Sequence, residues 1–242
     1  MRILVCSDIH ANMPALEAVL NAAAPFDAVW CLGDLVGYGP DVNEVIEKVR
    51  SLPNLACVLD NHDAAVVDHI ELASFNREAR TSILWTQGEI KRENREFLQS
   101  LPEKQVIGDA TLAHGSPRSP IWEYLLDSIA VHENFAHFDT PICFVGHTHI
   151  PVVYYWKGDA RPVDWQMLGH ADRPISKEKM IVNPGSVGQP RDRDPRAAYA
   201  IFWPDLATWE TFRVEYDISS VQKRILSANL PDHHAQRLSG GW

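Results

Sequence analysis

The chain has 242 residues, of which 45% are hydrophobic and 22% are charged, and its formal net charge is −10 at pH 7. This length fits one large domain, or at most two small ones, with enough apolar sequence for a sizeable core. The negative charge argues against broad binding of nucleic acids or anionic membranes, because the chain offers no basic field that would attract a polyanion.

Short apolar runs alternate with amphipathic segments near the N-terminus. The runs Ile3 to Cys6, Ala28 to Leu32 and Leu55 to Leu59 predict buried strands. Helices are predicted from Pro14 to about Ala24 and from Val42 to Val49, where apolar residues recur at helical spacing. This β-α-β-α-β order indicates a parallel sheet with right-handed crossovers.

The middle of the chain is predicted to be mainly helical. Residues Ala64 to Leu101 show no strand pattern, and a short helix is expected from about Ser128 to Phe138. Two further buried strands are predicted at Thr111 to Ala113 and at Ile142 to Val145, because both runs are short and apolar.

The pattern changes after Pro151, where antiparallel strands joined by turns are predicted. These strands are Val152 to Trp156, Met180 to Val182, Ala198 to Trp203 and Thr208 to Tyr216. The polar stretch Lys157 to Lys179 is predicted to be a surface excursion, and a last helix is predicted near Ile218 to Ala228.

Each of five predicted strands is followed at its C-terminal end by Asp, Asn or His. Open α/β sheets place their ligands beyond the carboxyl ends of strands, at one shared edge. A single Asp or His after a strand is commonly a capped turn, but five strands that end this way point to one polar site. The segments are Ser7-Asp8-Ile9-His10, Gly33-Asp34, Asp60-Asn61-His62-Asp63, His114-Gly115 and Gly146-His147-Thr148-His149.

The donor atoms at these strand ends suit two divalent metal ions, because nitrogen and oxygen ligands without thiolate are typical of Mn, Fe, Zn, Ni or Co sites. The residues predicted to hold the first ion are Asp8, His10 and His149. The residues predicted to hold the second ion are Asn61, His114 and His147.

Asp34 is the expected bridge between the ions, because one carboxylate can offer an oxygen atom to each. Two such ions can clamp a phosphate and activate a water nucleophile, and their charge reverses the local field of an acidic chain. A leaving alkoxide then needs a proton. His62 lies beside Asn61 but is not needed to complete the ligand set, and Asp63 could orient or charge its ring.

Together, these segments resemble the five motifs of the calcineurin-like metallophosphoesterases, in the same order and spacing over residues 1 to 150. The run Asn183 to Arg191 (Asn-Pro-Gly-Ser-Val-Gly-Gln-Pro-Arg) resembles that of the YfcE-like phosphodiesterases of bacteria and archaea. The resemblance implies an α/β fold, specifically a four-layer α-β-β-α sandwich of two mixed sheets. It also implies a dinuclear metal centre with the seven ligands named above, Mn²⁺ being the first choice of metal, and phosphoester hydrolysis with His62 as the acid.

One position departs from the family pattern, which usually has Gly where this chain has Asp60. If that Gly serves a left-handed backbone, Asp is among the better replacements. The site is therefore expected to survive the change, with altered geometry or altered affinity for the second metal.

One domain is expected to span residues 1–242. Residues 1–150 would form its metal-motif half, residues 151–230 a second-sheet half, and residues 231–242 a frayed tail. The four cysteines lie inside predicted strands without Cys-x-x-Cys spacing and are expected to be small buried side chains. With no signal-peptide pattern and no run of about 18 apolar residues, a soluble, cytoplasmic protein is expected.

The expected substrate is a small phosphodiester, phosphomonoester or nucleotide, with no duplex nucleic acid and no membrane as partner. Asn12, Arg118 and Arg191 lie beside motif residues and could contact a phosphate, although bracing a loop is an equal alternative for each. The sequence leaves the oligomeric state open.

Two alternatives remain within the enzymes: a nucleotide hydrolase of the diadenosine tetraphosphatase kind, and a phosphoprotein phosphatase. A third alternative is a non-catalytic interaction scaffold of the same fold. Scaffold members typically lack the acid or key ligands, whereas this chain retains His62 and all seven predicted ligands.

Overall fold

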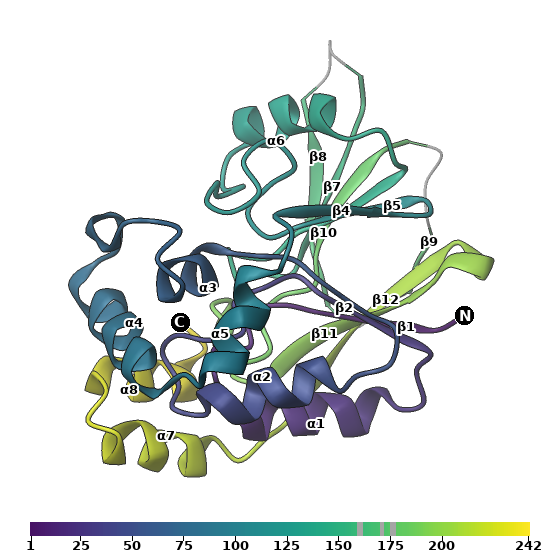
Figure 1. The fold of residues 1–242 in the computed structure, drawn as a ribbon. Coiled ribbons are helices and arrows are strands. Elements are labelled where there is room, and N and C mark those ends of the chain that lie inside the picture. The colour runs from purple at the N-terminus through teal and green to yellow at the C-terminus, as the bar shows by residue number, and fades with distance from the viewer. Residues whose placement is uncertain (159–161, 170–171, 175–177) are drawn as a thin grey trace.

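In the computed structural model, residues 1–158, 162–169, 172–174 and 178–242 are described. Two six-stranded sheets pack face to face, with helices on their outer sides (Figure 1). This arrangement confirms the predicted α-β-β-α sandwich of two mixed sheets.

The first sheet has the strand order β3-β2-β1-β11-β12-β9. Strands β1 to β3 are parallel, as the predicted crossovers require, and β11 joins β1 in the antiparallel direction with Leu4 opposite Ile201. The bounds are β1 (Ile3–Cys6), β2 (Ala28–Cys31), β3 (Leu55–Cys57), β9 (Asp172–Pro174), β11 (Ala197–Trp203) and β12 (Thr208–Val214).

The second sheet has the strand order β4-β5-β6-β10-β7-β8. Its centre is parallel, because β6 pairs in parallel with both β5 and β10, and its edges are antiparallel. The bounds are β4 (Lys104–Ile107), β5 (Ala110–Ala113), β6 (Ile142–Phe144), β7 (Val152–Tyr155), β8 (Asp164–Met167) and β10 (Met180–Asn183).

Some of the helices cover the outer faces of the sheets: α1 and α2 pack on the first sheet and α6 packs on the second (Figure 1). Helices α7 and α8 pack on each other in a separate cluster. Among the described residues, no helix has the length and apolar character needed to cross a membrane. The bounds are α1 (Met13–Ala23), α2 (Val42–Arg50), α3 (Asn61–Val66), α4 (Arg77–Glu89), α5 (Arg92–Gln99), α6 (Ser128–Asn134), α7 (Ile218–Ser227) and α8 (Asp232–Gly240), with 3₁₀ turns η1 (Leu72–Ser74), η2 (Phe135–His137) and η3 (Pro204–Leu206).

The main core lies between the two sheets. Successive residues of a strand point to opposite faces, so Val5 of β1 enters this core while Cys6 faces the helices. Trp30 links the layers, with its ring 6.0 Å from that of Phe144 in the second sheet. Both faces of β1 are therefore buried, which explains its continuous apolar sequence.

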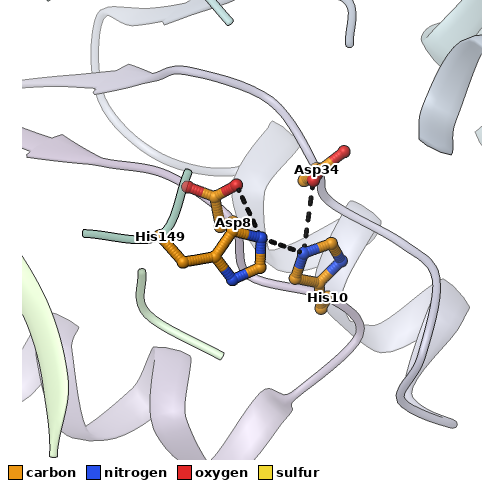
Figure 2. Close-up of side chains that lie close together, drawn as sticks. All are labelled: Asp8, His10, Asp34 and His149. Carbon is orange, nitrogen blue, oxygen red and sulfur yellow. Dashed lines mark hydrogen bonds and ion pairs between the residues drawn. The ribbon is translucent and has the colours of Figure 1, made fainter. Parts of the chain in front are cut away.

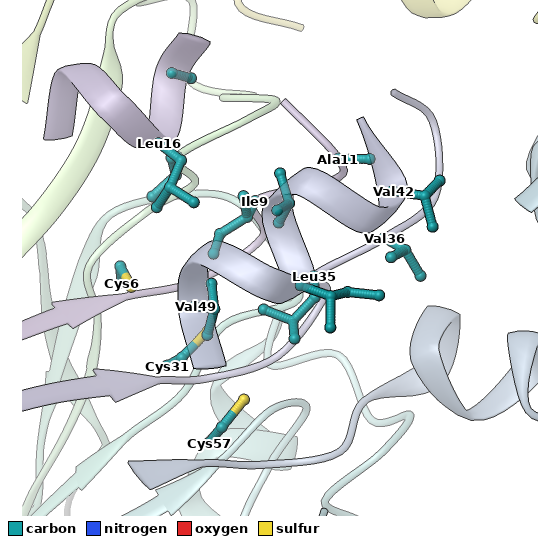
Figure 3. Packing of buried hydrophobic residues seen from close by; sticks show 14 of the residues in the cluster. Cys6, Ile9, Ala11, Leu16, Cys31, Leu35, Val36, Val42, Val49 and Cys57 are labelled. Carbon is teal, nitrogen blue, oxygen red and sulfur yellow. The ribbon is translucent and has the colours of Figure 1, made fainter. Parts of the chain in front are cut away.

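The four cysteines are buried and free, as expected. Cys6, Cys31 and Cys57 are register partners on adjacent parallel strands and face the helical side (Figure 3).

Three expectations about the second half of the chain need correction. Strands that follow residue 151 are divided between the sheets, so residues 151–230 do not form a separate second sheet. The stretch Lys157 to Lys179 contains β8 and β9, although residues 159–161, 170–171 and 175–177 lie outside the described part. Strand β8 pairs with β7 and is exposed along its length. Because none of its side chains is buried, burial imposes no apolar pattern on its sequence.

The third correction concerns the C-terminal tail, which was expected to be frayed. Residues Asp232 to Gly240 form helix α8, and α8 packs on α7 through Ala235 and Leu238. The sequence did not predict this helix because its packing partner lies on another helix and because the polar His234, although buried, interrupts the apolar pattern.

Strand β4 was not predicted either, because its residues alternate only between exposed and half-buried.

Candidate metal centre

Five of the seven predicted ligands have left-handed backbone conformations near the ends of their strands. Asp8, His10, Asp34, His147 and His149 have φ angles of 55°, 50°, 52°, 66° and 60°. Residues other than glycine rarely adopt such angles, at a cost of about 1–3 kcal/mol each, so the surroundings must hold them. Hydrogen bonds between strand ends do so, for example from the His10 amide to the Asp34 carbonyl at 2.8 Å.

One group of donors converges at the end of the first sheet. Ligand atoms of Asp8, His10, Asp34 and His149 all lie within 4.8 Å of one another (Figure 2). His10 Nε2 is 3.2 Å from Asp34 Oδ2, and His149 Nε2 is 3.3 Å from Asp8 Oδ1. Although His149 follows a strand of the second sheet, its imidazole reaches the carboxylates of the first.

A second group shares Asp34 with the first. Ligand atoms of Asp34, His114 and His147 lie within 4.8 Å of one another. His114 Nε2 is 3.6 Å from Asp34 Oδ2 and 3.1 Å from His147 Nδ1. Asp34 therefore belongs to both groups, and its predicted role as a bridge between two ions stays a prediction.

The imidazoles are oriented by backbone carbonyls. In every case the ring nitrogen that faces away from the cluster lies within hydrogen-bond distance of a carbonyl oxygen. These pairs are His10 Nδ1 with Val36 at 3.1 Å, His149 Nδ1 with Gln189 at 2.6 Å, His114 Nδ1 with Leu32 at 2.7 Å and His147 Nε2 with Trp122 at 3.1 Å.

This orientation fixes where the lone pairs point. A nitrogen that donates to a carbonyl carries the proton, so the other nitrogen of a neutral ring has a lone pair. His10 Nε2 and His149 Nε2 face each other at 3.2 Å, and His114 Nε2 faces His147 Nδ1 at 3.1 Å. Two lone pairs at that distance repel each other, whereas a cation bound by both nitrogens removes the repulsion.

The burial of carboxylate and imidazole groups at the centre also favours bound cations. Burial raises the pKa of the Asp34 carboxyl and lowers the pKa of the His10 and His149 imidazoles. Asp8 Oδ2, Asp34 Oδ1 and Asn61 Oδ1 are buried without a hydrogen-bond partner. Buried oxygens without partners are costly, and metal ions would satisfy them. The residues present therefore fit two metal ions.

Asp60 does not replace glycine in a left-handed conformation. Its φ angle is −126°, so the backbone explanation offered from the sequence is wrong. Asp60 caps α3 by accepting the Asp63 amide, and its other oxygen accepts the Asp34 amide. Gly33 makes room, since a Cβ there would lie 2.7 Å from the Asp60 Cβ.

His62 lies at this edge, but Asp63 does not orient it. The His62 Nε2 atom is 3.1 Å from the Tyr38 hydroxyl, and its Nδ1 has no hydrogen-bond partner. Asp63 instead accepts the Leu35 and Val36 amides, at 3.3 and 3.1 Å. The two residues are consecutive in α3, and neighbours on a helix do not face each other. Burial lowers the pKa of His62 to about 3.

The three predicted substrate contacts have different surroundings. Asn12 caps α1 with its oxygen and donates its amide to the Gly188 carbonyl, so it braces the fold. Arg118 is engaged in ion pairs with Glu123 and Glu133. Arg191 donates to Gln189 at 3.1 Å, but its buried Nε has no partner. Arg191 is thus the remaining candidate for contacting an anion.

Two tyrosines at the site have no counterpart in the sequence analysis. Tyr38 contacts His62, and its ring is 4.5 Å from that of His10. Tyr124 is stacked on His147 with ring centroids 3.6 Å apart. Tyr38 follows Gly37 in the loop after Asp34, which is a weak signal, while Tyr124 follows no motif.

The chain is similar to several known proteins. Residues 1–205 match the calcineurin-like phosphoesterase superfamily domain. A metallophosphoesterase structure from Sphaerobacter thermophilus is 45% identical, with a TM-score of 0.92 and coverage of 100% of this chain and 99% of that one. An uncharacterized protein of Methanocaldococcus jannaschii is 40% identical over 243 residues, which is 98% of this chain and 96% of that protein. A symmetrical bis(5'-nucleosyl)-tetraphosphatase of Proteus mirabilis is 40% identical over 67 residues, 26% of this chain and 24% of that enzyme.

Proposed function

Because the chain belongs to the calcineurin-like phosphoesterase superfamily, we propose that it hydrolyses small phosphodiesters or phosphomonoesters with two divalent metal ions. The proposal is carried by two pairs of facing imidazole nitrogens, one from His10 and His149 and the other from His114 and His147. Asp34 is close to both pairs. We assign Asp8, His10 and His149 to one ion, His114, His147 and Asn61 to the other, and Asp34 to both.

The protein's own residues would divide the remaining work. When bound, the two cations would neutralise the charge of the phosphate and activate a water molecule. Arg191 offers an unpartnered Nε–H to a phosphate oxygen at the same edge. His62 would give a proton to the leaving oxygen once the negative charge of a bound phosphate has raised the pKa of its ring from about 3, and the Tyr38 hydroxyl would hold that ring.

Mn²⁺ is the first choice of metal in this proposal, with Fe, Zn, Ni or Co as alternatives. Support comes from the donor set, which contains imidazole, carboxylate and amide groups but no thiolate. The four cysteines are free and buried, which supports a reducing compartment, and we place the protein in the cytoplasm on that ground.

A small substrate is favoured over a polyanion because the chain carries a net charge of −10. The run Asn183 to Arg191, which resembles that of the YfcE-like enzymes, favours a diester. The nucleotide hydrolase alternative draws on the short match to the Proteus mirabilis tetraphosphatase. The scaffold alternative is disfavoured by the complete set of donors and His62.

A hydrolysis screen tests the proposal. We expect protein treated with a chelator to be inactive on bis(p-nitrophenyl) phosphate and p-nitrophenyl phosphate. Addition of Mn²⁺, Ni²⁺ or Co²⁺ should restore turnover of at least one of the two esters. Turnover that survives chelation, or none with any metal and any phosphoester or nucleotide, would contradict it.

A further inference from the structure

A cavity of about 330 Å³ lies between the start of α6 and strands β7 and β8, of which β8 is the edge strand of the second sheet. Its volume is at the lower end of the range of about 300–1,000 Å³ found for small-molecule sites. It is lined by Val152 of β7, by Trp165 and Met167 of β8, and by Leu126 from the segment before α6. Val152 and Met167 are register partners.

The cavity is connected to the metal centre by two chain segments. On one side, the Trp122 carbonyl and the Tyr124 ring contact His147, and the next residues, Leu125 and Leu126, line the cavity. On the other side, Thr148, which separates His147 from His149, lines it as well. A group attached to a phosphate at the metal centre would therefore have the cavity beside it.

The lining residues indicate what the cavity can bind. Among the described residues that line it, none is Lys or Arg, so it does not suit a second phosphate. Trp165, Met167 and Leu126 are 58%, 45% and 67% exposed, which leaves flat and flexible apolar surface open to a ligand. Ser128 and Thr148 add hydroxyl groups that can pair with the polar edge of a ring.

We infer that this cavity binds the nucleobase of a nucleoside phosphoester whose phosphate lies at the metal centre. A planar base can stack on Trp165 and pair at its edge with the hydroxyls, whereas a simple alkyl group can do neither. The inference rests on the proposed phosphoesterase function and names the class of substrate, namely one that carries a base on the ester that is not cleaved.

The test compares two esters with the same leaving group. Thymidine 5'-(p-nitrophenyl phosphate) carries a base, and methyl p-nitrophenyl phosphate does not, so differences between them report the non-leaving group. For the metal-loaded wild-type protein we expect a lower KM for the thymidine ester.

Two variants at exposed positions remove the proposed contacts with little risk to folding. Trp165→Ala should raise KM for the thymidine ester by about 5-fold or more, the lower end of base–aromatic stacking. Leu126→Ala should act in the same direction with a smaller effect. Both should leave kcat/KM for the methyl ester within about 2-fold, as should the control Leu206→Ala, an exposed leucine of η3 that does not line the cavity.

The outcomes separate this inference from the proposed function. If the variants change neither ester, or both equally, the nucleobase site is wrong while the phosphoesterase function stands. The same holds if Trp165→Ala dissociates a dimer in sedimentation without changing kinetics, because the patch is then a contact between copies.

If neither ester is hydrolysed with any metal, calorimetry with thymidine 5'-monophosphate decides the matter independently of catalysis. Weaker binding to Trp165→Ala than to wild type keeps the nucleobase site. Equal binding, or none, overturns it.

Discussion

At the scale of single residues, His62 and Arg191 differ from the predicted ligands in what they contact. Ligand atoms of the predicted histidine and aspartate ligands lie within 4.8 Å of one another in two groups. The side chains of His62 and Arg191 instead hydrogen-bond to Tyr38 and Gln189, although the His62 ring also lies edge-on to that of His10 at 5.1 Å. Both residues keep a nitrogen without a hydrogen-bond partner, namely His62 Nδ1 and Arg191 Nε. Their roles can therefore be separated from metal binding by mutation.

His62→Ala is expected to keep both metals and to reduce kcat by about 10²-fold or more, the usual scale for loss of a general acid. The loss should shrink for p-nitrophenyl esters, since their leaving group needs little protonation. Metal content and kcat are measured together. Asp34→Ala is the control and should lose metal along with activity; if His62→Ala also lost metal, the residue would be a ligand.

Arg191→Ala and Arg118→Ala form a matched pair. Arg191→Ala should raise KM more than it lowers kcat, because its contact with a phosphate oxygen is expected in the bound substrate as well as in the transition state. Arg118→Ala should change KM by less than about 2-fold, since Arg118 is engaged by Glu123 and Glu133. Steady-state kinetics on one diester check both. Equal effects of the two variants would remove the distinction.

At the scale of elements, the C-terminal helix α8 is part of the site's framework. His234 of α8 lies 4.7 Å from the Tyr38 ring, measured between ring centroids, and the Gly241 carbonyl accepts the Arg193 amide at 2.7 Å. Helix α8 therefore supports both the Tyr38 loop and the loop that follows Arg191.

The packing of α8 on α7 should be measurable as stability. Leu238 is 3% exposed at this contact, and Leu238→Ala should lower the free energy of unfolding by about 2–4 kcal/mol, the usual cost of a buried Leu→Ala change. The control Leu226→Ala, on α7 and 48% exposed, should stay within about 0.5 kcal/mol of wild type. Urea unfolding measures both, and equal losses would show that α8 is not packed as described.

His234 should also make stability depend on pH. Burial lowers its pKa to about 4, so the folded protein resists protonation that the unfolded chain accepts below about pH 6.5. The stability that neutral His234 contributes to the free energy of unfolding is complete above about pH 6.5 and is lost as the pH falls toward 4. Between pH 7.5 and 5.0 wild type should lose about 2 kcal/mol more than His234→Phe, which keeps a ring but cannot titrate. Parallel losses in urea unfolding would contradict this.

The elements were predictable where a segment's own residues determine its burial. Strands such as Ile3–Cys6 are buried on both faces and carry continuous apolar sequence, and their polar ends mark the site. Strand β8 and helix α8 are stabilised by partners elsewhere in the sequence, so their own residues were not enough to predict them. The contact of His62 with Tyr38 was missed for the same reason, while Asp63 was placed wrongly because adjacency in sequence was taken for contact in space.

At the scale of the whole molecule, the two sheets meet to build one centre. Asp8 and Asp34 follow strands of the first sheet, and His114, His147 and His149 follow strands of the second. The His147 amide donates to Asp8 Oδ1 at 3.1 Å, so the sheets are joined at the site itself. A chain with a net charge of −10 thereby concentrates buried donors where cations can offset its charge.

The most direct test of the account is anomalous diffraction from crystals of the Mn²⁺-loaded protein. We expect two peaks per chain that both adjoin Asp34, one beside His10 and His149 and the other beside His114 and His147. A single peak, or peaks that do not share Asp34, would contradict the dinuclear centre proposed here.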